Sequence, residues 1–329
     1  MFAEFGLWAN IGVLVVSLLV LDKITDLTVD NAVKVANVTG SGKTTVGFIL
    51  VAFCTSLPAL SVSVFSALAE SMGVAVGNAL GSNIVNICLI LGLCLVLVFA
   101  KTRSNIKVLT SMDKGEIRNL YFGVFIGSAI PLTLIYIGYA TPFIGIILLT
   151  VFGVYTFRLI RVKSIWEGSF DLDLKPKQNV GRYTSWALLS AVGVVIVSYF
   201  VVDSASYIAI SMGIPSVVIG GTVVALGTSI PVLMASIRSI RRGYVDMAFG
   251  NIVGTCFVNT TLILGASLLV SPQRIVDMSG FSSLVMFSVI ANMLLWYFLA
   301  NERIGWREGV VLLFMYFLFL TISLGGYKP

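Results

Sequence analysis

The sequence contains no histidine, only four cysteines and few charged side chains, which make up 11% of its 329 residues. Without histidine, and with so little cysteine, it offers neither a disulfide framework nor a histidine and cysteine cluster for a metal. A soluble domain usually carries about 25% charged residues. Hydrophobic residues instead make up 58% of the chain, which indicates a protein embedded in lipid. The cysteines lie in apolar stretches, where we expect them to pack as small apolar side chains: Cys54, Cys88, Cys94 and Cys256.

Apolar stretches of membrane-spanning length recur along the whole chain, and about 20 such residues suffice to cross the hydrocarbon core. The first stretch lacks the basic start and the small-residue cleavage site of a signal peptide, so we expect it to be retained. The sequence predicts an all-α membrane protein with ten transmembrane helices, at residues 7–30, 44–69, 72–99, 119–138, 142–160, 183–210, 214–239, 246–270, 281–300 and 305–325.

The placement of the basic residues predicts the orientation in the membrane. The formal net charge is +6, which by itself would also suit a nucleic-acid partner. With both termini outside, only Arg274 and Lys328 of the 21 basic residues fall on the outer side. This is the bias expected of cytoplasmic loops. We therefore expect a multi-pass protein of the cell membrane with a cytoplasmic central linker, with the lipid bilayer and no nucleic acid as its partner.

The chain repeats itself at an offset of 173 residues, and residues 29–92 align with 202–265 without a gap. Each copy contains five predicted spans, and an odd number forces the second copy to enter the membrane from the opposite side. Secondary transporters are commonly built from such inverted repeats around a site near the bilayer midplane. A duplicated scaffold without transport is the alternative. The predicted units are a first repeat (1–161), a short cytoplasmic linker (162–182) and a second, inverted repeat (183–329).

Two matched segments carry a proline inside a predicted span. They read Thr-Ser-Leu-Pro at 55–58 and Thr-Ser-Ile-Pro at 228–231. Proline has no amide proton and clashes with the preceding turn, so we expect both helices to break, at Pro58 and Pro231. A break frees carbonyl oxygens, which a membrane tolerates only in a protein interior or a water-filled cavity, where they can coordinate a cation.

The third and eighth spans carry matched polar residues on one face. Ser82 and Asn86 are four residues apart, and Thr255 and Asn259 repeat the arrangement. A single such residue in a membrane helix is more often interhelical glue than an ion ligand. Two matched sets beside two predicted helix breaks favour an ion site.

The segments around residues 51–64, 77–92, 223–237 and 250–265 resemble the two signature repeats of the calcium/cation antiporter superfamily, most closely its prokaryotic sodium/calcium exchangers. The resemblance covers nearly the whole ten-span plan. It implies a cation antiporter that works by alternating access, with inorganic cations as substrates. It implies no catalytic residues and no cofactor beyond the transported ions. Of these ions, sodium is expected and calcium is left open. The ion ligands that it implies are Ala52, Thr55, Ser56, Ser82, Asn86, Ala225, Thr228, Ser229, Thr255 and Asn259.

The sequence departs from that family at the centre of the implied site. The family usually has a glutamate directly after each proline, where this chain has Ala59 and Val232. Sodium/calcium exchangers often have an aspartate where this chain has Asn259. A carboxylate oxygen about 2.4 Å from a divalent ion contributes a gross attraction on the order of 10 kcal/mol at an effective dielectric of about 20. We therefore expect a monovalent cation such as sodium to be favoured and calcium transport to be weak.

Two alternatives remain open at this point. A non-transporting relative could keep the scaffold for sensing or partner binding, or the uncharged site could accept a different ion, including an anion. The acids outside the implied site are expected to serve interfacial solvation or helix packing. They are Asp22, Asp26, Asp30, Glu70, Asp203 and Asp246.

Overall fold

The computed structural model describes residues 6–38, 45–102, 114–137, 141–161, 180–241, 245–270, 278–300 and 304–325, which are helical or turn throughout. The helices are α1 (Gly6–Val38), α2 (Thr45–Leu68), α3 (Met72–Ile84), η2 (Val85–Leu91), α4 (Gly92–Thr102), α6 (Lys114–Ile137), α7 (Pro142–Arg161), α8 (Val180–Met212), α9 (Ser216–Ile219), η3 (Gly220–Val224), α10 (Ala225–Thr228), α11 (Ile230–Arg241), α12 (Val245–Val258), η4 (Asn259–Ile263), α13 (Leu264–Val270), α14 (Met278–Ala300) and α15 (Trp306–Gly325). The three η segments are π-helical turns inside longer helical runs.

The helical runs follow the predicted spans one by one. Within the described residues, seven runs are long and apolar enough to cross a membrane, and three shorter apolar helices accompany them. The seven are Gly6–Ile24, Met72–Phe99, Val192–Met212, Ser216–Ile237, Ala248–Val270, Phe281–Ala300 and Trp306–Gly325; the shorter ones are Thr55–Leu68, Tyr121–Thr133 and Pro142–Phe157. Each of the ten predicted spans overlaps one of them. The all-helical membrane fold is therefore confirmed.

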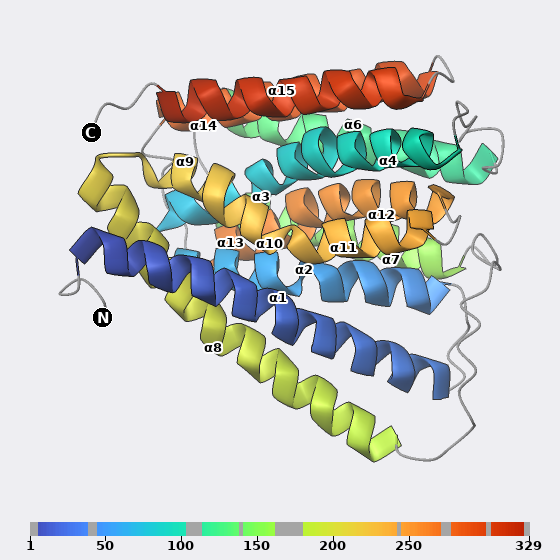
Figure 1. Cartoon of the computed structure of the whole chain (residues 1–329), viewed down its shortest axis with the longest axis horizontal. Helices are drawn as coiled ribbons and strands as arrows, with labels where there is room; N and C mark the ends of the chain where they lie inside the picture. Colours follow the sequence, from blue (N-terminus) through green and yellow to red (C-terminus); the bar gives the residue numbers. More distant parts are fainter. Residues whose placement is uncertain are drawn as a thin grey trace.

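The two halves of the chain run in opposite directions. Helices α1 and α8 each contain 33 residues and match at the repeat offset to within one residue. They pack against one another, and in Figure 1 α1 runs away from the end at which α8 finishes. Repeat-equivalent helices that lie antiparallel are what an inverted repeat requires.

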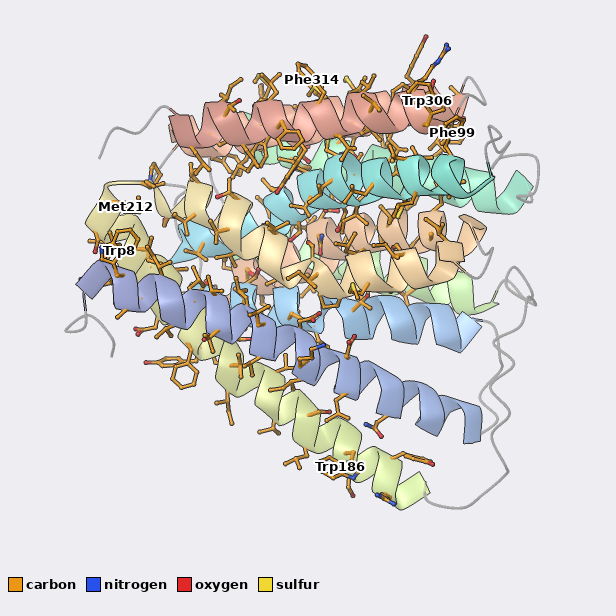
Figure 2. All side chains as sticks on the ribbon, in the orientation of Figure 1. Trp8, Phe99, Trp186, Met212, Trp306 and Phe314 are labelled. Carbon is orange, nitrogen blue, oxygen red and sulfur yellow. The ribbon has the colours of Figure 1, made fainter. Side chains whose placement is uncertain are left out.

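Helix termini that carry basic residues lie at one end of the bundle. In Figure 1, α4, α7 and α11 end on the right, where α6, α8 and α15 begin. Helix α1 begins and α15 ends on the left. Tryptophan marks both ends, since Trp8 lies at the left and Trp306 lies at the right (Figure 2). Tryptophan is enriched at membrane interfaces, so the long axis of the bundle fits the membrane normal.

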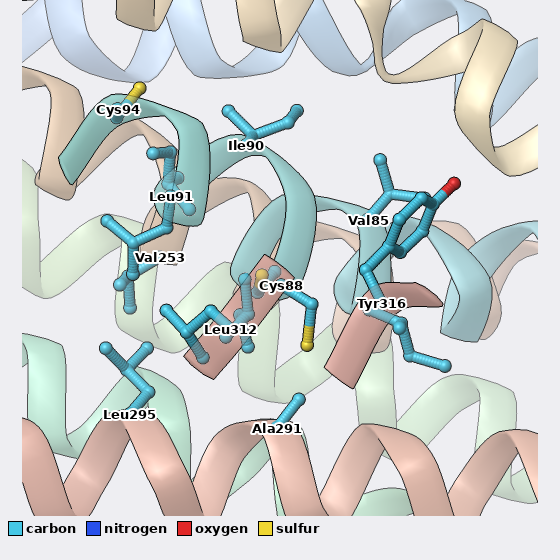
Figure 3. Packing of buried hydrophobic residues seen from close by; sticks show 14 of the residues in the cluster. Val85, Cys88, Ile90, Leu91, Cys94, Val253, Ala291, Leu295, Leu312 and Tyr316 are labelled. Carbon is cyan, nitrogen blue, oxygen red and sulfur yellow. The ribbon is translucent and has the colours of Figure 1, made fainter. Parts of the chain in front are cut away.

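Apolar side chains fill the space between the helices. Figure 3 shows one such cluster, in which Cys88 and Leu91 of η2 and Val253 of α12 lie among Leu295 of α14 and Leu312 of α15. Cys88, Cys94 and Cys256 are free thiols buried in this cluster, in keeping with the packing role expected of them.

The polar residues of the interior are uncharged. Among the described residues, every buried polar side chain belongs to Asn, Ser or Thr. Small neutral side chains of this kind can hydrogen-bond within a helix bundle without the cost of burying a charge. Apart from Oδ1 of the partly exposed Asp22, a buried oxygen of α1, an ion held in the described interior would therefore meet neutral groups.

The expected break at Pro58 is wrong. Helix α2 continues from Thr45 to Leu68 with Pro58 inside it. A proline withholds only its own N–H, from the carbonyl four residues earlier, and the neighbouring hydrogen bonds can carry the helix past the gap. The second copy is interrupted at one residue, Ser229, which lies between α10 and α11 with φ −91° and ψ −2°. Helical hydrogen bonds still cross this point, since Ser229 N–H donates to the Ala225 carbonyl and Leu233 N–H to the Ser229 carbonyl, each at 3.1 Å. The break expected at Pro231 is therefore a one-residue interruption two residues before the proline.

Candidate ion-binding site

The implied ligands lie on elements that pack around one region of the interior. Helix α2 contacts α3, α10, α12 and η4, while η2 contacts α12 and η4 contacts α3. Ala52 lies in α2, and its side chain is outside the described part of the structure. The other nine implied ligands have described side chains, and all are buried: Thr55, Ser56, Ser82, Asn86, Ala225, Thr228, Ser229, Thr255 and Asn259.

The two central asparagines each lie in a π-helical turn. Asn86 is the second residue of η2, and Asn259 is the first residue of η4. The two turns coincide at the repeat offset, so the distortion belongs to both halves. π-Helical turns occur frequently at functional sites, since they widen the helix and displace side chains from their regular positions. The sequence pattern gave no sign of either turn.

Close contact between the repeats depends on glycine. A Cβ on Gly81 of α3 would overlap the carbonyl oxygen of Gly221 in η3, and one on Gly77 would lie 2.8 Å from the Gly221 amide nitrogen. These glycines therefore let α3 approach η3 closely, which brings the two backbones together beside the site.

Several buried polar atoms around this region have no hydrogen-bond partner. A buried polar group without a partner is costly, so a cluster of them indicates missing water or a missing ion. Neither amide atom of Asn86 has a partner in bonding geometry, although the thiol of Cys256 lies beside it. The unpartnered oxygens are Ser56 Oγ, Ser82 Oγ, Asn86 Oδ1, Asn251 Oδ1 and Asn259 Oδ1, and the unpartnered amide nitrogens are Asn83 Nδ2 and Asn86 Nδ2.

Two hydrogen bonds cross between the repeats within this region. Thr228 Oγ1 donates to Asn78 Oδ1 at 2.8 Å, and Asn259 Nδ2 donates to Asn83 Oδ1 at 3.1 Å. The second bond turns the amide nitrogen of Asn259 toward Asn83 and leaves Asn259 Oδ1 available as a ligand. Thr255 instead donates within its own helix, to the Asn251 carbonyl at 2.7 Å.

Asn78 and Asn83 were absent from the sequence-derived set of ligands. Asn78 could have been found from the sequence, because it matches Asn251 at the repeat offset. Asn83 could not have been found, because it matches Cys256. A mismatch in a repeat gives no reason to select either residue.

The two residues after the signature prolines, where the resemblance implies glutamates, are buried and apolar. Ala59 is 4% exposed and Val232 is 1% exposed. Of the acids outside the site, Glu70 is exposed in the turn after α2, with φ 58°, and Asp22, Asp26 and Asp203 are partly exposed. The side chains of Asp30 and Asp246 lie outside the described residues. Asp22 Oδ1 in α1 is itself buried, but Asp22 is not among the implied ligands.

The geometry fits a family of membrane exchangers. The model of the sodium/calcium exchanger protein family matches residues 9–161 and 183–325. The chain belongs to this family. Members are transporters rather than enzymes, and the chain is accordingly an exchanger-type antiporter of the membrane.

Related proteins match along most of the chain. It is 29% identical to the sodium/calcium exchanger MaX1 of Methanosarcina acetivorans, over 95% of this chain and 98% of that protein. It is 30% identical to the uncharacterized membrane protein MJ0091 of Methanocaldococcus jannaschii, over 82% and 83% of the two chains.

Solved exchangers share the fold. The H⁺/Ca²⁺ exchanger CAX matches with a TM-score of 0.77 at 16% identity, covering 96% of this chain and 87% of that one. The sodium-calcium exchanger NCX_Mj matches with a TM-score of 0.64 at 24% identity, covering 97% and 99%. At these identities the likeness supports the architecture alone.

Proposed function

We propose that this exchanger carries a monovalent cation such as sodium through a midplane site of neutral oxygens, by alternating access, and that it transports calcium weakly. The observation that carries the proposal is the uncharged character of the buried region: its unpartnered oxygens belong to serine and asparagine. The proposed ligands are the ten implied by the resemblance, with Ala52 and Ala225 supplying backbone carbonyls.

Electrostatics support the choice of a monovalent ion. Two carboxylates beside a divalent ion would each contribute on the order of 10 kcal/mol of gross attraction at an effective dielectric of about 20. Ala59 and Val232 contribute none of it, and neutral oxygens cannot offset the dehydration of calcium to the same degree. Neutral oxygens do bind dehydrated monovalent cations in channel filters. The balance therefore favours sodium or potassium over calcium.

The unpartnered amide nitrogens favour a second candidate. Asn83 Nδ2 and Asn86 Nδ2 are buried donors, which a cation cannot satisfy. Water retained by a monovalent cation would accept these hydrogen bonds, and a small anion would also accept them. An anion exchanger is therefore the alternative, and the scaffold of a non-transporting sensor is a third.

The orientation is part of the same proposal. Lys101, Arg161, Arg182 and Arg241 lie near helix ends at one end of the bundle. By the positive-inside bias that end is cytoplasmic. Both termini then face outward, and the linker 162–182 joins the first repeat (1–161) to the second (183–329) on the cytoplasmic side.

Ion flux in proteoliposomes tests the proposal. The purified chain is reconstituted, and uptake is followed under imposed gradients of sodium, potassium, calcium, protons and chloride, with protein-free vesicles as the control. We expect exchange of sodium or potassium at rates well above the control and calcium uptake at least about tenfold slower. Chloride uptake without cation flux would establish the anion alternative, and no flux of any ion would leave the sensor.

A further inference from the structure

The amide of Asn78 joins two repeats at the edge of the site. Its Nδ2 donates to the Ala59 carbonyl at 3.1 Å and to Ser63 Oγ at 2.9 Å, both in α2. Its Oδ1 accepts the hydroxyl of Thr228 in α10 at 2.8 Å. We call the two proline-containing helices the signature helices; they are α2 in the first repeat and the run from α9 to α11 in the second. One buried side chain of α3 therefore contacts both signature helices.

The equivalent residue of the second repeat, Asn251, reproduces one of these three hydrogen bonds. Asn251 Nδ2 donates to Ser236 Oγ at 3.3 Å, which reproduces the bond between Asn78 and Ser63 at the repeat offset. The counterpart of Thr228 is Thr55. Yet Asn251 Oδ1 is buried and has no partner. The cross-repeat hydrogen bond is thus present on one side of the molecule and missing on the other.

The backbone shows the same asymmetry. The signature helix of the second repeat contains the π-turn η3 and is interrupted at Ser229, directly after the threonine that bonds to Asn78. The signature helix of the first repeat, α2, continues past Pro58. Inverted repeats of a transporter can exchange conformations between its two access states. The structure then represents one of two states that differ in which signature helix carries this distortion.

We propose that Asn78 and Asn251 are positioning residues that hold the two signature helices in turn, each by accepting a hydrogen bond from the threonine of the opposite repeat. In the state described here, Thr228 donates to Asn78. In the opposite state, Thr55 donates to Asn251, α2 takes up the distortion, and the run from α9 to α11 becomes a regular helix. This inference depends on alternating access, which belongs to the proposed function, and it names residues that lie outside the implied set of ligands.

Because the hydrogen bond passes from one asparagine to the other, the two access states stay close in free energy. A buried oxygen without a partner destabilises whichever state contains it, and each state contains one. Because Asn78 and Asn251 are chemically identical, the cost is similar in both states. A ligand can then shift the population through a modest difference in affinity.

Hydrogen–deuterium exchange in lipid nanodiscs tests the proposal. Peptides covering residues 55–60 and 228–233 are followed in the wild type, in Asn78→Ala and in Asn251→Ala. Loss of Asn78 destabilises the described state, so exchange should rise at 55–60 and fall at 228–233. Loss of Asn251 should produce the reverse. Each variant should change the ratio of the two exchange rates about two- to tenfold, the range for one buried hydrogen bond.

Further variants separate positioning from packing. The double variant, Asn78→Ala with Asn251→Ala, should return the ratio to the wild-type value. Thr228→Val keeps the shape of the side chain, removes only the donor and should reproduce Asn78→Ala; it also serves if the alanine variant does not fold. If both peptides exchange faster in every variant, the two asparagines are merely structural and the proposal is wrong. Hydrogen–deuterium exchange requires no ion flux. The selectivity proposal can therefore fail while this proposal stands, and this proposal can fail while the selectivity proposal stands.

Discussion

At the scale of single residues, the central asparagines Asn86 and Asn259 are the strongest candidates for ion ligands. Both are 0% exposed, and both present an amide oxygen without a hydrogen-bond partner. Not every buried asparagine is such a candidate. Asn31 of α1, for example, donates to the Leu27 carbonyl of its own helix at 2.7 Å. Burial alone therefore does not mark a ligand, whereas burial without a partner beside a second such residue does.

Replacing either central asparagine should impair transport. Asn86→Ala and Asn259→Ala each remove one coordinating oxygen, and we expect the rate of cation uptake to fall by at least about tenfold, since a hydrogen bond or ligand contact to a charge contributes roughly 1.5–3 kcal/mol. Uptake in proteoliposomes at equal protein content measures the effect. Asn31→Ala is the matched control and should retain wild-type uptake; equal losses in all three variants would argue against a specific role.

Transport should also be insensitive to pH. The chain contains no histidine, and none of its described buried residues is an acid. No carboxyl or imidazole group at the site can therefore bind or release a proton between about pH 5.5 and 8. Initial rates of sodium or potassium uptake, measured with equal pH on both sides of the vesicle membrane, should vary less than about twofold. A steep dependence on pH would reveal a titrating ligand among the residues outside the described part.

At the scale of helical elements, the contact between α3 and η3 fixes the distance between the two repeats. Gly77 and Gly81 face Gly221 with no room for a side chain. Since backbone atoms lie on both sides, a methyl group cannot be accommodated by a change of rotamer. The helices must separate, and the polar residues next to them must separate as well.

Gly81→Ala should therefore destabilise the protein. Overpacking of this kind typically costs about 1–3 kcal/mol, and we expect the thermal unfolding midpoint in detergent to fall by several degrees. Gly153 of α7 is the matched control, because a Cβ added there meets nothing within 4 Å. Gly153→Ala should leave the midpoint unchanged or raise it slightly. An unchanged midpoint in Gly81→Ala would contradict the close contact.

The helices could be predicted from sequence, but their distortions could not. The length of the apolar stretches predicted the positions of all ten spans. This worked because the cost of burying unpaired backbone polar groups in lipid leaves few alternatives to a helix. The identical prolines at 58 and 231 gave equal predictions for two helices that differ, since a proline weakens one hydrogen bond and tertiary packing decides whether the helix breaks. The bond between Asn83 and Asn259 was equally hidden, because it joins residues that the repeat does not relate.

At the scale of the whole molecule, two antiparallel repeats enclose an interior whose buried polar residues, within the described part, are all neutral. The chain has the exchanger fold, and Ala59 and Val232 are buried at the positions where the resemblance implies glutamates. In the proposed function, the fold supplies the means of exchanging two access states, and the side chains at its centre select the ion. The proposed change of selectivity therefore needs no change of architecture.

Calcium uptake by a charge-restored variant tests this account most directly. Ala59→Glu and Val232→Glu are introduced together, folding is checked by gel filtration, and calcium and sodium uptake are measured in proteoliposomes beside the wild type. The account predicts that the ratio of calcium to sodium uptake rises by at least about tenfold in the variant, because two carboxylates attract a divalent ion far more strongly than a monovalent one. Rapid calcium uptake by the wild type, or an unchanged ratio in a folded variant, would contradict it.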